Sequence, residues 1–444
     1  MLEKITELIE SRQYLKLREL IQDMNVADIA AVFEDLSNDY VVKVFRILPK
    51  SQAADIFSYL PSEDQQYIVN SLTDKEAANI IDNLSSDDAA DLMEELPASV
   101  VKKLLSQTTP ETRRDINHLL QYPEDSAGSV MTVEFIDLKE YYTVRHSIDI
   151  IRREGIDKET INICYVLNPR RKLIGTVSLR KLLLSDPDET IGNIMHENVV
   201  TIKTLDDQED VAHTFKKYDF TSMPVVDSEG RLVGIITVDD IVDIMEQEAT
   251  EDIEMMAAIT PTDKPYTKTG IFETYKKRIP WLLLLMISAT FTSKIIQTYE
   301  EALASYVILT SFIPMFMDTG GNAGGQASVS IIRSISLGEI EFRDIFKIIW
   351  KEIRVAVLCG LTLAVINFAK LMIIDRVIVP VAFVVCITMA ITVLFAKIVG
   401  CSLPLLAKKI GFDPAVMASP FITTIVDAAS LMIYFQIAKA LLHI

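Results

Sequence analysis

Residues 318–326, with the sequence DTGGNAGGQ, decide how the C-terminal half of this chain is interpreted. Four glycines within six positions are poor helix formers, and a membrane tolerates such a backbone where it is buried in protein or lines water. Asp318, Asn322 and Gln326 recur at i, i+4 and i+8, so they share one helix face. This polar face favours a lined pathway, and tight helix packing through the small residues is the alternative.

Five apolar stretches, one of which contains this segment, are long enough to cross a bilayer, which takes roughly 20 helical residues. They lie near residues 279–298, 304–332, 353–374, 377–400 and 414–441. The links at one side are rich in Lys and Arg, whereas the opposite links hold little beyond Lys294 and Arg376. By the positive-inside bias, the N-terminal half is cytosolic and the C-terminus lies outside.

Asp427 lies in the middle of the last apolar stretch. A carboxylate at this depth costs at least ~2.5 kcal/mol, so it usually faces a cavity, a partner or an ion. The hydroxyls of Thr423, Thr424 and Ser430 lie about one turn away and predict a hydrated surrounding. An oxygen-only site that keeps its waters suits a divalent ion. The alternative is an ion pair within the bundle, for instance with Lys397.

The charge of the chain is unevenly distributed. Residues 1–270 carry 51 acidic and 28 basic side chains, and residues 271–444 carry 11 and 15. An acidic soluble part argues against a nucleic-acid partner, because phosphate binding needs a basic face. The four cysteines are scattered without metal-ligand spacing, and the first residues lack the apolar core of a signal peptide. We therefore expect residues 1–270 to remain in the cytosol.

Residues 239–254 hold eight carboxylates and no Lys or Arg, about 25 residues before the first membrane-length stretch. Many of them share a helix face, where each like-charged pair repels by a few tenths of a kcal/mol. A helix with this charge beside a membrane requires a cation. The segment therefore predicts a cation-regulated membrane protein.

Leucine recurs every 12 residues from Leu36 to Leu96, each time followed by a turn or capping residue and then by acidic residues. This pattern predicts a right-handed stack of short helices, a small solenoid. Asp87 and Asp91 share one face of the unit that begins at Ser85, where they would be either solvated charge or contacts for a divalent ion.

A second repeat places Gly175 and Gly234 59 residues apart, and Ser178 and Thr237 at the same interval. It resembles a tandem pair of cystathionine-β-synthase (CBS) domains, modules that often bind adenine nucleotides. In that family an Asp three residues after the Ser or Thr takes the ribose hydroxyls. Asp240 matches this position, and the first copy has Lys181 there instead. The resemblance thus implies a nucleotide contact at Thr237 and Asp240, together with Arg180.

The order of these parts, with the glycine-rich segment, EATED at residues 248–252 and the Asp427 stretch, resembles the MgtE family of magnesium channels over nearly the whole chain. The fold class it implies is multidomain: an α-helical solenoid N-domain, α/β tandem CBS domains, a connecting plug helix and an all-α transmembrane domain of five helices. The boundaries follow at residues 1–128, 129–190, 191–245, 246–270 and 271–444.

The resemblance implies a homodimer in the inner (plasma) membrane, surrounded by lipid, with the pore along its two-fold axis. Asp427 of each subunit would bind hydrated Mg²⁺, and the plug, in the region of residues 241–262, would close the cytosolic mouth when Mg²⁺ is abundant. The implied pore-lining residues are Asp318, Asn322, Gln326, Thr423 and Thr424. The implied sensor ligands are Asp87, Asp91, Glu209, Asp219, Asp240, Asp243, Glu248, Glu251, Asp252 and Asp413.

The function predicted is Mg²⁺ uptake gated by cytosolic Mg²⁺, with ATP as a further ligand of the CBS pair. One alternative is a channel for Mn²⁺, Co²⁺ or Ni²⁺, against which the absence of His and Cys near Asp427 argues. Another is a nucleotide sensor that the membrane part merely anchors. An enzyme is not expected, since none of the five histidines pairs with a Ser or Cys in a recognisable motif.

Overall fold

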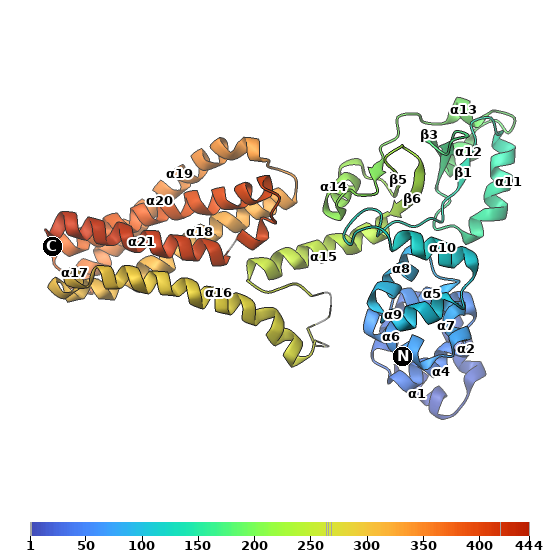
Figure 1. Cartoon of the computed structure of the whole chain (residues 1–444), viewed down its shortest axis with the longest axis horizontal. Helices are drawn as coiled ribbons and strands as arrows, with labels where there is room; N and C mark the ends of the chain where they lie inside the picture. The colour runs from blue at the N-terminus through green and yellow to red at the C-terminus, as the bar shows by residue number, and fades with distance from the viewer. Residues whose placement is uncertain (1, 263, 265, 268, 418, 444) are drawn as a thin grey trace. The chain divides into compact units, whose positions relative to one another are not determined.

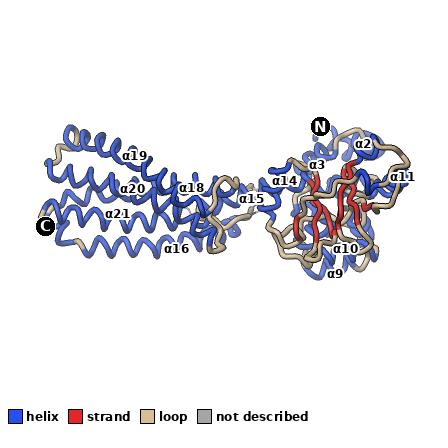
Figure 2. The backbone as a smooth tube through the Cα atoms, turned by 90° about the horizontal axis from the view of Figure 1, so that it is seen from above, coloured by secondary structure: helices blue, strands red, loops and turns tan. Residues whose placement is uncertain are grey.

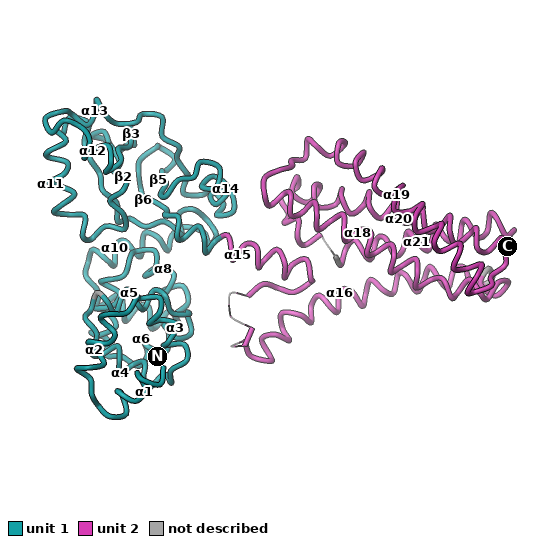
Figure 3. Tube along the Cα trace, turned by 180° about the vertical axis from the view of Figure 1, so that it is seen from behind, with its two compact units in different colours: residues 1–244 teal, residues 245–444 magenta. Residues whose placement is uncertain are grey.

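The structure is a computed structural model that describes residues 2–262, 264, 266–267, 269–417 and 419–443 (Figure 1). The chain divides into two compact units, residues 1–244 and residues 245–444 (Figure 3). The first unit holds a helical N-domain and two small sheets, and the second holds the long helices.

The N-domain consists of short helices whose first residues are 12 positions apart. They are α1 (Leu2–Glu10), α2 (Tyr14–Gln22), α3 (Val26–Glu34), α4 (Asn38–Phe45), α5 (Lys50–Ser58), α6 (Ser62–Ser71), α7 (Asp74–Ile81), α8 (Ser86–Glu95), α9 (Ala98–Leu105) and α10 (Pro110–Leu119). Helices α3, α5, α7 and α9 contact one another in succession, as do α4, α6, α8 and α10. The repeat thus extends beyond the leucines that indicated it. Its right-handed sense stays a prediction.

The 12-residue period has a local cause. Leu36, Leu48, Leu60 and Leu96 precede the turns and are buried in one continuous core. Capping residues then start the next helix, as at Thr73, where Glu76 Oε2 accepts a 2.8 Å hydrogen bond from the Thr73 backbone N–H and Thr73 Oγ1 accepts one from Glu76 N.

Two three-stranded sheets follow, visible as the red segments in Figure 2. The first contains β1 (Asp137–Leu138), β2 (Ile163–Leu167) and β3 (Leu173–Ser178), and the second contains β4 (Ile202–Lys203), β5 (Ser222–Val226) and β6 (Leu232–Thr237). In both, the first strand is parallel to the second and the second antiparallel to the third. The accompanying helices are α11 (Val144–Glu154), η1 (Gly155–Asp157), α12 (Leu179–Leu184), α13 (Ile191–Ile194) and α14 (Gln208–Tyr218).

A backbone segment that precedes each sheet forms hydrogen bonds with the last strand of the other sheet. The N–H of Thr132, in the segment before β1, donates to the Ile235 carbonyl in β6 at 2.8 Å. The N–H of His196, in the segment before β4, donates to the Thr176 carbonyl in β3 at 2.8 Å. The repeated glycines lie at these crossings. A Cβ on Gly175 would lie 2.7 Å from Met195 Sδ, and one on Gly234 would lie 2.6 Å from Met131 Sδ. Only glycine leaves room for the crossing segment.

Helix α15 (Val238–Met256) continues directly from β6, so the predicted boundary between residues 245 and 246 lies inside one helix. The second unit then contains α16 (Ile271–Thr298), α17 (Glu300–Ser305), η2 (Val307–Phe312), α18 (Ile313–Ser336), η3 (Phe342–Asp344), α19 (Ile345–Ile373), α20 (Val379–Lys409), η4 (Ala415–Met417) and α21 (Ser419–Leu442). Among the described residues, four helical segments are long and apolar enough to cross a membrane: 271–298, 342–373, 379–409 and 415–442.

The second of the five predicted spans is not among these four segments. Its predicted start at residue 304 is wrong, because residue 304 lies in the short helix α17, the 3₁₀ segment η2 follows, and the long helix begins only at Ile313, followed by Pro314. The glycines and polar residues of α18 lower its apolar character, so length and composition alone do not mark it as a span. The third span was predicted to start too late in the sequence, at residue 353, whereas α19 begins at Ile345.

The glycine-rich segment is helical throughout. A Cβ on Gly320 would lie 2.8 Å from Val426 Cγ1, one on Gly324 would lie 2.7 Å from Ile422 Cγ2, and one on Gly400 of α20 would overlap the carbonyl of Gly324. Close packing against α20 and α21 therefore overrides the low helix propensity of these residues. The small-residue packing that was the alternative interpretation holds for this face of α18.

Candidate functional site

The opposite face of α18 is polar and open. Asp318, Asn322 and Gln326 are exposed, and Asn322 Nδ2 donates to Asp318 Oδ1 at 3.1 Å. Nothing lies within 4 Å of a Cβ placed on Gly325, which belongs to the same face. The predicted sharing of one face is confirmed. One helix thus combines a close-packed face with a polar face that its own bundle leaves uncovered.

Asp427 lies on α21, whose neighbouring residues Val426 and Ser430 pack against Gly320 of α18. Its side chain is half-buried, and in the described part of the chain no hydrogen bond or ion pair engages its carboxylate. The proposed alternative, a pair with Lys397, is wrong. Lys397 Nζ lies 3.6 Å from Glu352 Oε2 of α19, and both side chains are largely buried.

The hydroxyls near Asp427 are engaged with protein. Thr423 and Thr424 donate to the carbonyl of Pro420 at 3.1 and 2.8 Å, and Thr424 Oγ1 also lies 3.0 Å from Ser288 Oγ of α16. Ser430 donates to the carbonyl of Val426 at 2.5 Å. Within one chain, Thr424 therefore faces α16, while Thr423 lies beside Gly321 of α18.

A second group of carboxylates gathers in the first unit, where the start of α8 meets the start of α15. Asp87 is buried, and burial, together with the nearby Asp240 and Asp88 carboxylates, raises its pKa well above the usual value. Burial also raises the pKa of Asp240 to about 6, although the Thr237 hydroxyl donates to Asp240 Oδ2 at 2.7 Å and opposes the shift. The carboxylates crowd together without a fixed positive charge between them.

Three further carboxylates join this group. Asp91 keeps much of its side chain in solvent, yet the atoms packed around it, with Asp88 and Glu94, raise its pKa to about 7. Glu159 and Asp88 also belong to this group, although neither was predicted from the sequence. Partial burial and then Asp240 and Asp239 raise the pKa of Glu159 to about 7, and burial raises that of Asp88. Asp88 lies in the repeat unit that contains Asp87, whereas no pattern marks Glu159.

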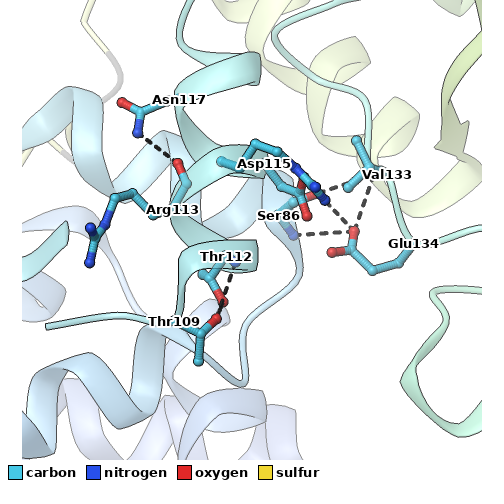
Figure 4. A network of polar contacts seen from close by, with 9 residues as sticks. Ser86, Thr109, Thr112, Arg113, Asp115, Asn117, Val133 and Glu134 are labelled. Atoms are coloured by element: carbon cyan, nitrogen blue, oxygen red, sulfur yellow. Dashed lines mark hydrogen bonds and ion pairs between the residues drawn. The ribbon is translucent and has the colours of Figure 1, made fainter. Parts of the chain in front are cut away.

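A polar network holds the first turn of α8 in place (Figure 4). The Ser86 hydroxyl donates to Glu134 Oε2 at 2.7 Å, and the backbone N–H groups of Ser86 and Val133 donate to the same oxygen at 3.4 and 3.1 Å. Because a carboxylate at a helix N-terminus is favoured, Glu134 stabilises this end of α8. The network thereby fixes Asp87 and Asp88 beside Asp239 and Asp240.

A cleft of about 2190 Å³ within the first unit is lined by Asp87, Asp88, Glu159, Asp239, Asp240 and Asp243, along with the basic residues Arg114, Arg153 and Arg231. Asp91 is not among its lining residues. No group of three or more His, Cys, Asp or Glu in the described residues is arranged closely enough to hold a metal ion.

Two predicted sensor ligands lie elsewhere. Glu209 is in the first turn of α14, 3.7 Å from His213 Nε2, and Asp219 ends that helix in the left-handed conformation at φ 53°. Neither residue lines the cleft with Asp87. The structure of one chain thus brings together Asp87, Asp91, Asp240 and Asp243, and leaves Glu209 and Asp219 on α14.

The predicted nucleotide contacts are divided as well. The Thr237 hydroxyl donates a hydrogen bond to the Asp240 carboxylate. The charges that act on Asp240 are those of Asp239 and Asp88, and these negative charges would repel a triphosphate at this position. Arg180 is exposed on α12, and no hydrogen bond or ion pair in the described chain joins it to either residue. In the first copy, the Ser178 hydroxyl caps α12 by accepting from the Lys181 N–H at 3.2 Å.

A third acidic group lies in the second unit, at the C-terminal end of α15. Asp252 Oδ2 accepts a 2.6 Å hydrogen bond from the Ser336 hydroxyl of α18. Burial raises the pKa of Asp252, and the nearby Asp413 acts in the same direction, whereas the Ser336 hydrogen bond and Arg333 lower it. The predicted neighbours Asp252 and Asp413 are thus brought together, and Ser336 and Arg333 are additions that the sequence did not indicate.

Packing supports this contact. Met255 and Met256 of α15 lie against Ile332 of α18 and Ala415 of η4. On the same stretch of α15, Glu248 is half-buried and Glu251 is exposed. The end of α15 is therefore docked, by two methionines and one carboxylate, on the end of the glycine-rich helix.

Three family models match the chain. One described as MgtE, a divalent cation transporter, matches residues 313–437, the MgtE intracellular N domain matches residues 24–125, and a CBS domain matches residues 191–247. The chain is 38% identical to the magnesium transporter MgtE of Thermus thermophilus, over 77% of this chain and 76% of that protein. It is 35% identical to that of Bacillus subtilis, over 76% and 74%.

Two solved structures are similar to the first part of the chain. The cytosolic domain of the Mg²⁺ channel MgtE in complex with ATP is 36% identical, with a TM-score of 0.53, and the match covers 55% of this chain and all of that one. The soluble part of a magnesium transporter is 31% identical, also with a TM-score of 0.53, over 56% and 98%.

Proposed function

Because the chain belongs to the MgtE family of magnesium transporters, we propose that it is a Mg²⁺-selective channel that admits Mg²⁺ to the cell and closes when cytosolic Mg²⁺ binds its acidic groups. The observation that carries the proposal is the carboxylate of Asp427, which has no partner in the described chain although it lies within a membrane helix. Such a group needs an ion or a second subunit.

The pore would form between two copies of the chain. The uncovered polar face of α18 and the Asp427 edge of α21 supply oxygen atoms from side chains, and no His or Cys stands beside them in sequence. Oxygen ligands that retain water suit Mg²⁺, which gives up its hydration shell reluctantly. Inward flow needs no ATP hydrolysis, since 100 mV supplies ~2.3 kcal/mol per charge, and twice that for a divalent ion.

Flux into liposomes tests this proposal. Purified protein is reconstituted with an entrapped Mg²⁺ indicator, and an inside-negative potential is imposed. We expect Mg²⁺ entry that empty liposomes lack, with weaker entry of Mn²⁺, Co²⁺ and Ni²⁺ at equal concentration. Faster entry of a transition metal than of Mg²⁺ would favour the alternative channel, and absence of any flux would reject both.

Closure would use the acidic groups at both ends of α15. Without cation, the carboxylates around Asp87 and Asp240 repel one another, as do those near Asp252, and the cytosolic parts loosen. A cation that binds between them favours the docked state by its preference for that state alone. Several loose, hydrated sites together give a sensor that responds in the millimolar range.

The carboxylates of α15 give the first test of the sensor. In the variant Glu248→Gln, Glu251→Gln, Asp252→Asn, closure loses its ligands, so we expect Mg²⁺ entry to continue at an internal Mg²⁺ concentration roughly tenfold above that which closes the parent. The same flux assay, with internal Mg²⁺ varied, measures this. Glu246→Gln, on the same helix, is the matched control and should close normally. Closure of the triple variant at the internal Mg²⁺ concentration that closes the parent would contradict the sensor role.

Stability against pH gives a second test. The raised carboxyl pKa values mean that the folded protein binds more protons than the unfolded chain, so this stabilising contribution is complete below about pH 4 and is lost as pH rises through about 6 to 7. With a chelator present, we expect the melting temperature to fall by roughly 5 °C between pH 5 and pH 8. Mg²⁺ should restore it at pH 8 and have little effect at pH 5.

The variant Asp87→Asn, Asp91→Asn, Asp240→Asn should show a smaller pH dependence, of which the remainder comes from Glu159, and little Mg²⁺ effect. Glu34→Gln, Asp35→Asn, Asp39→Asn removes the same number of acidic groups from exposed positions of the N-domain and should behave as the parent. An equal Mg²⁺ effect in both variants would show that Mg²⁺ acts through general charge screening.

ATP is the second ligand that we propose for the first unit. The support is the similarity to the cytosolic domain solved with ATP, together with the basic residues of the cleft, Arg153, Arg171 and Arg231. The polyphosphate would lie towards these and away from Asp240. Protection of the cytosolic part from trypsin by ATP without Mg²⁺ would support a nucleotide site, and protection by Mg²⁺ alone would leave the cation as the only ligand.

Membrane insertion follows from the family and the apolar helices, and we propose the inner (plasma) membrane with the N-terminus in the cytosol. The basic residues in the first turns of α16, at the end of α18 and start of α19, and at the end of α20 support this orientation.

A further inference from the structure

One face of α19 changes character along the helix. In its first turns the exposed residues are Phe346, Lys347, Trp350, Lys351 and Arg354. At 100° per residue these five fall within about 140° of the helix circumference. They therefore form one basic and aromatic face.

The same face continues as an aliphatic surface. Leu358, Leu361 and Val365 are exposed in the same angular range, within the segment that is apolar enough to span a membrane. Trp350 is 61% exposed and lies at the transition, where aromatic side chains mark the boundary between hydrocarbon and headgroups. The basic residues consequently lie at the headgroup level of one leaflet.

The charges of this face are uncompensated. In the described chain, Lys347 and Lys351 take part in no hydrogen bond or ion pair, and Arg354 contacts only its own helix, through the Trp350 carbonyl at 3.3 Å and the Trp350 ring. The nearest acidic residue of the helix, Glu352, is turned inward and paired with Lys397. Three like charges at i, i+4 and i+7 repel one another unless an anion lies between them.

We propose that Lys347, Lys351, Arg354 and Trp350 form a binding site for the headgroup of an anionic phospholipid, such as phosphatidylglycerol. The phosphate lies among the three cations, the acyl chains lie along Leu358, Leu361 and Val365, and the Trp350 ring covers the glycerol region. A free phosphate or nucleotide fits the cations but leaves the aromatic and aliphatic part of the face uncovered. The continuity of the face with the lipid-facing surface therefore selects a lipid.

Trp350 itself reports the occupant. The chain has two tryptophans, so Trp281→Phe leaves Trp350 as the single fluorophore. The full-length protein is reconstituted in phosphatidylcholine bilayers that contain either brominated phosphatidylglycerol or brominated phosphatidylcholine at equal mole fraction. We expect the anionic lipid to quench Trp350 with a roughly fivefold higher association constant. The variant Lys347→Gln, Lys351→Gln, Arg354→Gln should reduce this ratio to about one.

Lys276→Gln, Arg278→Gln is the matched control, because it removes exposed cations from the first turns of α16 and leaves the face intact. Its ratio should equal that of the Trp281→Phe parent. Equal quenching by the two lipids, or an equal loss in the control, would overturn the proposal. Displacement by water-soluble glycerol phosphate would also overturn it, in favour of a free anion. Independently of any substitution, mass spectrometry of lipid retained by the unmodified protein in detergent should show enrichment of anionic over zwitterionic phospholipid, and no enrichment would count against the site.

Discussion

Asp427→Ala is expected to reduce Mg²⁺ uptake at least about 100-fold while the protein still folds. The reason is that, in the proposed pore between two copies of the chain, a hydrated ion would lose one charged acceptor from each copy, and each charge-assisted hydrogen bond contributes roughly 1.5–3 kcal/mol. Folding should be retained, because in the described chain no residue depends on this carboxylate for a hydrogen bond or an ion pair. Flux into liposomes and the melting temperature in detergent measure the two effects separately.

Asp427→Asn distinguishes charge from shape, since the amide keeps the size of the side chain and loses its charge. We expect it to resemble Asp427→Ala in flux. Glu339→Gln, in the exposed link after α18, is the control for a carboxylate of the membrane unit outside the pore and should transport normally. Normal uptake by Asp427→Ala would remove Asp427 from the ion pathway.

The largest effect on stability is expected from Lys397→Met. Lys397 and Glu352 have relative exposures of 7% and 14%, so removal of the lysine leaves a carboxylate buried in the membrane bundle without its partner. Breaking a buried pair in this way costs about 3–5 kcal/mol. Unfolding in a denaturing detergent, followed by circular dichroism, should detect the loss.

Glu352→Gln together with Lys397→Met should recover most of this stability, because no unpaired charge then remains. The pair of Lys370 and Asp375, at 2.8 Å with relative exposures of 50% and 30%, provides a matched comparison at the other end of α19. Lys370→Met should cost no more than about 1 kcal/mol. A loss as small as this for Lys397→Met would mean that water or lipid headgroups reach Glu352 in the membrane.

The two faces of α18 connect packing with function. Gly320 and Gly324 let α20 and α21 approach so closely that side chains have no room, and this approach brings Val426 and Ser430, the residues around Asp427, onto α18. The polar face with Asp318 and Asn322 is thereby held at a set position relative to Asp427. A helix with larger residues on its packed face would separate the two polar groups.

Most of the correct predictions about the fold came from periodic patterns in the sequence. The 12-residue leucine period indicated the short helices, because a helix of 8–10 residues and its turn bury one leucine per repeat. The 59-residue offset indicated the paired sheets, and its glycines turned out to lie where Met195 and Met131 cross. The i, i+4, i+8 spacing placed Asp318, Asn322 and Gln326 on one face, because helix geometry is local.

Contacts between distant segments were the part that could not be predicted. Glu352 was outside the predicted third span, so its pairing with Lys397 was not predicted. For the same reason, Lys397 was considered as a partner for Asp427. Glu159 meets Asp240 from a loop of the first sheet copy, and Ser336 meets Asp252 from the end of α18. No local sequence pattern predicts contacts of this kind between distant segments.

By itself, the sequence determined the repeats, the uneven charge, the apolar helices, and the isolated carboxylate at Asp427, since each depends on composition and on spacing along one element. Tertiary structure alone decided that the glycines of α18 pack as an unbroken helix, that Lys397 serves Glu352, and that Asp87 is buried beside Asp240. The physical reason is that backbone propensity and charge pairing are settled by close packing between helices and by burial. Both depend on which segments come together, and not on their neighbours in the chain.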